Sequence, residues 1–93
     1  EFGGIGLRVD GHLWQEEKLF AYKTVKTSDR LTDWYLSLLE KLEQLRDEGL
    51  SAAIYTELTD VEYEINGLLT YDREVMKMDA ARVKLAHKRL IGR

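Results

Sequence analysis

Residues 29–56 read DRLTDWYLSLLEKLEQLRDEGLSAAIYT, and this stretch decides the fold class. In its first part apolar side chains recur at steps of three and four residues, which predicts a helix from about Asp29 to Asp47. Thr27 or Ser28 can cap the amino end of this helix, and Gly49 suits its carboxyl end. We expect one apolar stripe of the helix to face the core: Leu31, Trp34, Tyr35, Leu38, Leu39, Leu42 and Leu45.

The second part of the stretch, from Leu50 to Thr56, is short and apolar and does not alternate with polar residues. Such a run is typical of a strand that is buried on both faces, as in a parallel sheet. A helix that leads through one glycine into such a strand is half of a βαβ unit. The stretch therefore predicts an α/β protein with one buried strand.

A second main helix is predicted towards the other end of the chain, from Asp79 to about Leu90. Asp79 can cap it, and basic residues in its last turn interact favourably with the partial negative charge at the carboxyl end of the helix. One side of this helix carries the apolar residues Val83, Ala86, Leu90 and Ile91. Before the first helix the pattern is weaker: residues 1–6 are expected to be irregular, and residues 7–26 indicate only short strands or turns around Leu13 and Leu19.

Between the predicted strand and the last helix lies an acidic stretch, residues 57–67. Its Asn66-Gly67 pair is a hairpin signal, and a long irregular loop is the competing interpretation. Glu57, Asp60, Glu62 and Glu64 gather at the carboxyl end of the predicted strand. In barrels and open α/β sheets that edge is where active sites form, so these carboxylates form either part of a site or a solvated acidic loop.

The two histidines lie in different contexts. His87 falls among Lys84, Lys88 and Arg89 of the last helix, which indicates a surface residue. His12 precedes Leu13 and Trp14, so it either lines a pocket or has a structural role. Neither histidine lies in the sequence context of a Ser/His/Asp hydrolase.

Composition excludes several functional classes. The 93 residues are enough for one domain, residues 1–93, and 14 Lys plus Arg against 17 Asp plus Glu give a net charge of -3. This balance argues against nucleic-acid binding, and no apolar run approaches the roughly 20 residues that span a membrane. The chain has no cysteine and only two histidines, so we expect neither a metal site nor a cofactor.

Two strings of residues resemble one family of enzymes. The string AIYTELTDVE (residues 53–62) and the string NGLLTYDR (residues 66–73) resemble the last strand and the following loop of glycoside hydrolase family 2 barrels. This family contains β-galactosidases and β-glucuronidases. The opening EFGG (residues 1–4) resembles the end of the seventh strand, and the two predicted helices follow in the expected order. The chain departs from the family pattern at Glu57, where Gln is more frequent, and at Tyr63, where Gly is.

The resemblance implies a partial (β/α)8 TIM barrel: the end of strand 7, helix 7, strand 8 and helix 8. It implies hydrolysis of a β-linked carbohydrate with retention, in which Glu1 acts as the nucleophile. The acid/base glutamate of such barrels belongs to the fourth strand, which precedes these residues, so the 93 residues alone are expected to be inactive. Trp14, Glu57 and Asp60 are candidate contacts to the carbohydrate substrate.

The implied partner in the protein is the remainder of the barrel, and the edge of the strand at residues 52–56 offers a surface for self-association. Two other hypotheses stay open. The chain is either a small helix-rich module that binds a protein partner through the Leu/Trp helix, or a domain that binds carbohydrate without catalysis. The pattern indicates a soluble protein, in the cytoplasm or secreted.

Overall fold

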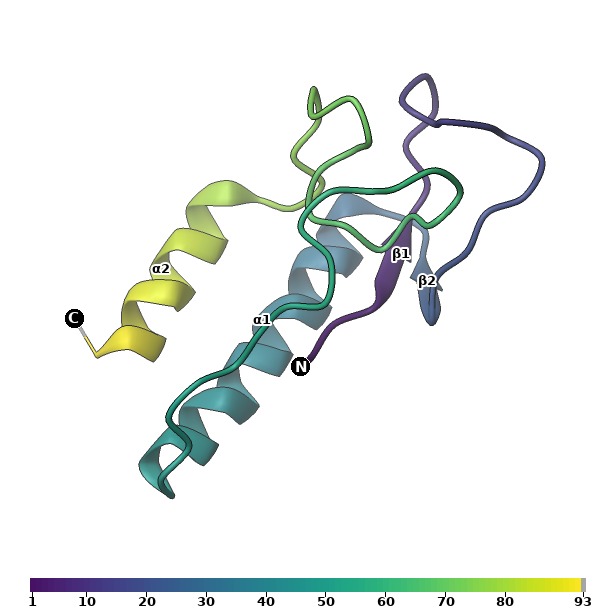
Figure 1. Cartoon of the computed structure of the whole chain (residues 1–93). Helices are drawn as coiled ribbons and strands as arrows, with labels where there is room; N and C mark the ends of the chain where they lie inside the picture. Colours follow the sequence, from purple (N-terminus) through teal and green to yellow (C-terminus); the bar gives the residue numbers. More distant parts are fainter. Residues whose placement is uncertain (93) are drawn as a thin grey trace.

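Helix α1 spans Ser28–Asp47 in the computed structural model, which describes residues 1–92 (Figure 1). This confirms the first predicted helix. Thr27 is its N-cap, and the Thr27 side chain accepts a hydrogen bond from the Arg30 N–H. At the other end Gly49 has a φ of 118°, and its N–H donates to the Arg46 carbonyl while the Leu50 N–H donates to the Leu45 carbonyl. Glycine relieves the strain of this positive φ, so the two bonds end the helix there.

Most of the apolar stripe of α1 faces the core, as predicted. Leu31, Tyr35 and Leu39 are buried, whereas Leu45 near the end of the helix is 46 % exposed. The stripe packs against β1 and against the second helix. The core cluster consists of Ile5, Leu7, Leu31, Tyr35, Leu39, Met78, Val83 and Ala86.

Helix α2 spans Ala80–Ile91 and confirms the second predicted helix. Asp79 caps it by accepting from the Ala81 and Arg82 N–H groups. Val83 and Ala86 are buried as expected, but Ile91 is 67 % exposed, because it lies in the last turn beyond the reach of the core. Neither helix in the described part of the chain has the length and apolar character that a membrane span requires.

Two side chains of α1 attach α2 at both of its ends. The Thr32 hydroxyl, which is fully buried, accepts a hydrogen bond from the Asp79 N–H at 2.9 Å. At the other end the Arg46 guanidinium donates to the Arg89 carbonyl at 2.9 Å and also to the Leu90 carbonyl. A cation at the carboxyl end of a helix also opposes the partial negative charge there.

The sheet consists of β1 (Ile5–Leu7) and β2 (Lys23–Val25), which run parallel with Ile5 opposite Lys23 and Leu7 opposite Val25. All three residues of β1 are buried. The prediction that residues 1–6 are irregular was wrong for Ile5 and Gly6, because a three-residue strand is too short to show a period. Both helices begin at the end of the molecule where β1 ends and run back in the opposite direction, with α1 beside β1 and α2 beside α1 (Figure 1).

The predicted strand at residues 50–56 is not a strand in the structure. Leu50 and Ile54 are 41 % and 70 % exposed, and only Tyr55 pairs, in a parallel bridge with Phe2. The Phe2 N–H donates to the Ile54 carbonyl at 2.9 Å, and the Thr56 N–H donates to the Phe2 carbonyl at 2.8 Å. A strand needs partners along its length, and here Phe2 supplies one pairing. The buried strand of this α/β protein is β1 instead.

Candidate functional site

The two long loops of the chain, residues 8–22 and 57–77, meet at the end of the molecule where β1 ends (Figure 1). The Phe20 N–H donates to the Tyr63 carbonyl, and the Ile65 N–H donates to the Phe20 carbonyl, both at 2.7 Å. Residues 57–77 form a long irregular loop, so the competing interpretation of the Asn66-Gly67 pair is the correct one. The charged and polar side chains that are buried or held by hydrogen bonds gather in these loops.

Asp72 is held in one orientation by its own loop. Its Oδ1 accepts hydrogen bonds from the Thr70 hydroxyl at 2.5 Å and from the Glu74 N–H at 3.1 Å. Arg73, between the two acidic residues, has a φ of 62°, a left-handed conformation that is uncommon outside glycine. The hydrogen bond from Thr70 is the main reason that the pKa of Asp72 falls to about 2. Asp72 is therefore ionised at neutral pH.

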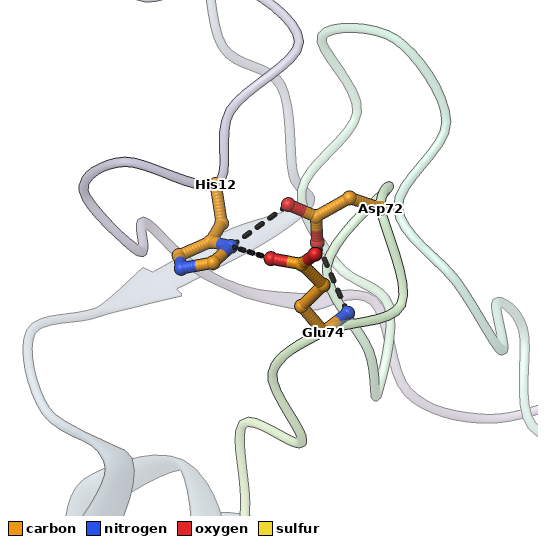
Figure 2. Close-up of side chains that lie close together, drawn as sticks. All are labelled: His12, Asp72 and Glu74. Atoms are coloured by element: carbon orange, nitrogen blue, oxygen red, sulfur yellow. Dashed lines mark hydrogen bonds and ion pairs between the residues drawn. The ribbon is translucent and has the colours of Figure 1, made fainter.

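His12 of the first loop joins two carboxylates of the second loop (Figure 2). His12 Nδ1 lies 2.8 Å from Asp72 Oδ2 and 3.6 Å from Glu74 Oε2. The side chains of His12 and Asp72 are about a quarter exposed (28 % and 23 %), and that of Glu74 is 70 % exposed. We call His12, Asp72 and Glu74 the loop cluster. Asp72 Oδ1 is already bonded within its loop, so Oδ2 is the oxygen that faces His12.

Trp14 lies near this cluster in the sequence and contacts the residue before Asp72. Its ring meets the Tyr71 ring edge-on, with the centroids 5.8 Å apart. Trp14 is 62 % exposed and Tyr71 is 38 % exposed. The predicted carbohydrate contact at Trp14 is thus an accessible aromatic surface rather than part of the core.

Glu57 belongs to a separate acidic pair with Glu64. The Asn66 side chain is fully buried, and the orientation of its amide that satisfies both neighbours donates to Glu57 Oε1 at 2.6 Å and to Glu64 Oε2 at 3.0 Å. Burial, followed by the charge of Glu64, raises the pKa of Glu57 to about 8. Two carboxylates this close cannot both ionise easily, so Glu57 is mostly protonated at neutral pH.

Asp60, the next predicted contact, lies in a buried ion pair. Lys77 Nζ donates to Asp60 Oδ1 at 2.8 Å and to the Ile65 carbonyl at 2.9 Å. The side chains of Lys77 and Asp60 are 0 % and 3 % exposed. The Gly67 N–H also donates to Asp60 Oδ1, and a Cβ at Gly67 would lie 2.5 Å from the Asp60 nitrogen, so only glycine fits there. Asp60 thus organises the loop and is not accessible to a sugar.

Glu1 lies beside the segment that pairs with Phe2. The Thr56 hydroxyl donates to Glu1 Oε1 at 3.4 Å, a long hydrogen bond. The Phe2–Tyr55 pairing is parallel, so Glu1 lies on the side of Ile54, and its side chain reaches along the segment to the Thr56 hydroxyl. The structure therefore brings Glu1 to Thr56, and brings Trp14 to Tyr71, the residue before Asp72 of the loop cluster.

Sequence reasoning missed the partners of these residues. The loop cluster joins positions 60 residues apart, and Lys77 pairs with Asp60 across 17 positions, so no local period reveals either. His87 was predicted to be a surface residue, but it is only partly exposed and its Nε2 lies 2.7 Å from the Tyr35 hydroxyl. One indication of this burial was present in the sequence: Tyr35 lies in the apolar stripe of α1, so a residue that faces Tyr35, as His87 does, is partly buried.

The residues define an α/β protein with two helices, a two-stranded parallel sheet and a polar loop end. No protein-family model matches the chain. A search of curated proteins finds no match either.

Proposed function

We propose that these residues form the last two βα units of a (β/α)8 barrel that hydrolyses a β-linked carbohydrate with retention. The observation that carries the proposal is the parallel pairing of Phe2 with Tyr55 across α1. Two parallel segments joined through a helix, with a second helix after them, have the order of strand 7, helix 7, strand 8 and helix 8. In such barrels the carboxyl ends of the strands carry the catalytic residues, whereas Glu1 precedes Phe2 and β1, so the assignment of Glu1 rests on the sequence resemblance.

Glu1 is the proposed nucleophile. It would attack the anomeric carbon to form a glycosyl-enzyme intermediate, which water then hydrolyses. The Thr56 hydroxyl donates a long hydrogen bond to the Glu1 carboxylate, and Glu57, protonated at neutral pH, is hydrogen-bonded to Glu64. The acid/base carboxyl group, about 5 to 5.5 Å from the nucleophile, would come from the remainder of the barrel. The 93 residues alone are therefore expected to be inactive.

The surface beside Tyr55 supports the proposal that further segments of a barrel pack against these residues. A cavity of about 410 Å³ lies between α1, α2 and residues 50–55, lined by apolar side chains that include Phe2, Leu39 and Leu90. The Tyr55 hydroxyl is buried and has no hydrogen-bond partner among residues 1–92, and burial raises the pKa of Tyr55 to about 12. Buried hydroxyls are normally bonded, and residues 1–92 supply no partner for this one; a further segment of the barrel at this face would cover the apolar cavity.

The alternative of a protein-binding module depends on the Leu/Trp stripe of α1. Leu31, Tyr35 and Leu39 of that stripe are buried in the core, so they are not available to a partner in this structure. The alternative of a carbohydrate-binding domain without catalysis shares the accessible Trp14 surface, and the experiment below separates it from the hydrolase.

The test uses the complete product of the gene that encodes these residues. A 2-deoxy-2-fluoro-β-glycoside with a good leaving group should leave a covalent adduct on the peptide that contains Glu1. Glu1→Gln should abolish both the adduct and turnover, whereas Glu16→Gln, an exposed loop glutamate, should change neither. Turnover with an adduct on another residue would refute the nucleophile assignment. Sugar binding without turnover or adduct would favour the non-catalytic domain.

A further inference from the structure

The loop cluster has a donor set that the proposed hydrolase mechanism does not use. It offers one imidazole nitrogen and two carboxylate oxygens, and the three ligand atoms all lie within 4.8 Å of one another. They come from two loops that other hydrogen bonds already hold together, so their meeting is set by the fold. We propose that His12, Asp72 and Glu74 bind a divalent metal ion of the zinc class.

Two of the three separations are close to those around a small tetrahedral ion. Zinc bonds of about 2.0 to 2.1 Å place two neighbouring tetrahedral ligands about 3.3 Å apart. The separations from His12 Nδ1, 2.8 Å to Asp72 Oδ2 and 3.6 Å to Glu74 Oε2, lie on either side of that value. The separation to Glu74 has to shorten by about 0.3 Å, which its exposed side chain allows, and the separation to Asp72 has to lengthen by about 0.5 Å.

The hydrogen bonds that Asp72 accepts are of the kind that orient the ligands of metal sites. Thr70 and the Glu74 N–H both bond Asp72 Oδ1, which leaves Oδ2 for the metal. Such partners fix the direction of a ligand before the ion arrives. The metal would replace the hydrogen bond between His12 and Asp72, and the single proton of the neutral imidazole would then be on Nε2.

The mixed donor set indicates which ion is favoured. Calcium takes six to eight oxygen ligands and magnesium prefers oxygen with near-octahedral geometry, whereas an imidazole nitrogen suits zinc and similar ions. Three protein ligands leave one position of a tetrahedral ion for water or another ligand. The exposed rings of Trp14 and Tyr71, which contact each other, lie close in the chain to His12 and Asp72.

Isothermal titration of the 93-residue chain with Zn²⁺ tests the proposal, together with the visible spectrum of the Co²⁺ form. We expect one ion per chain and a Co²⁺ spectrum of low coordination number. His12→Gln should abolish binding, and Glu74→Gln should weaken it by about tenfold or more. Matched controls are His87→Gln, at the other histidine, and Glu62→Gln, at an exposed carboxylate of the same loop; both should bind as the unchanged chain does.

Glu74→Gln also decides the result if His12→Gln fails to fold, because the Glu74 side chain is 70 % exposed and its loss leaves the core intact. The proposal is overturned if neither ion binds, or if Glu74→Gln binds as tightly as the unchanged chain. It is also overturned if binding is lost in His87→Gln but kept in His12→Gln. Equal affinity for Ca²⁺ and Zn²⁺ would show an unselective acidic surface and would overturn it too.

Discussion

Lys77→Met is the substitution for which the structure makes the strongest prediction. Methionine keeps most of the buried apolar stem of Lys77 and removes its charge. Asp60 would then retain the Gly67 N–H as its partner, with its side chain only 3 % exposed, and the Ile65 carbonyl would lose a donor. Removing one partner of a buried ion pair typically costs about 3 to 5 kcal/mol, because the other charge stays buried.

That cost is large for a chain of this size. A domain of 93 residues has a free energy of unfolding of roughly 5 to 14 kcal/mol. At about 4 to 8 °C per kcal/mol, even a loss of 3 kcal/mol would lower the Tm by roughly 12 to 24 °C. Circular dichroism during heating and during urea unfolding would measure both quantities, and Lys41→Met on the exposed face of α1 is the matched control, expected within about 0.5 kcal/mol of the unchanged chain.

The double variant Asp60→Asn, Lys77→Met separates the ion pair from simple packing. Asparagine keeps an oxygen for the Gly67 N–H and removes the buried charge, so the double variant should recover much of the stability lost by Lys77→Met. If Lys77→Met costs less than about 1 kcal/mol, or if the double variant is no more stable than the single one, the reasoning about the buried charge is refuted.

Three further predictions concern other parts of the molecule. The pKa of Glu57 is raised in the folded chain to about 8 from an ordinary 4.5, so between these pH values the folded state binds more protons than the unfolded state. The free energy of unfolding should therefore fall as pH rises from 4.5 to 8. Urea unfolding at several pH values should show a much smaller fall in Glu57→Gln. Asp79→Ala removes the cap of α2 and should cost about 0.5 to 2 kcal/mol in the same assay, and a cost near zero would show that the cap is dispensable. If the free edge at residues 52–56 mediates self-association, sedimentation should show an oligomer that Ile54→Lys, at a 70 % exposed side chain, converts to monomer; a monomeric unchanged chain at high concentration would contradict this.

The helices could be predicted from the sequence because their signals are local. The apolar stripe of α1, the Thr27 cap and the cap at Asp79 all act within a few residues, so tertiary structure had little to change. Residues 50–56 show the limit: an apolar run predicts a strand only when another segment pairs with it along its length, and Phe2 pairs with Tyr55 alone.

The candidate sites could be predicted only in part, for the same reason. The acidic stretch indicated Glu57 and Asp60 as candidates, but their environments depend on residues elsewhere in the loop. Glu57 lies beside Glu64, and Asp60 forms an ion pair with Lys77. The loop cluster depends on a contact between His12 and Asp72 that only the folded loops create. The residue types predicted which side chains can act as acids, bases or ligands, and the contacts between the loops determined which of them come together.

The attachment of α2 to α1 at both ends has a consequence for how the molecule opens. Thr32 holds the start of α2 and Arg46 holds its last carbonyls, so α2 cannot unwind from either end without breaking a contact to α1. Amide hydrogen exchange in the two helices should therefore follow one common opening reaction. Residues 8–22 form few backbone hydrogen bonds among themselves, so they should exchange through smaller and more frequent openings while the helix pair stays closed. Residues 57–77 form several such bonds, for example from the Asp60 N–H to the Leu69 carbonyl, and should exchange more slowly than residues 8–22.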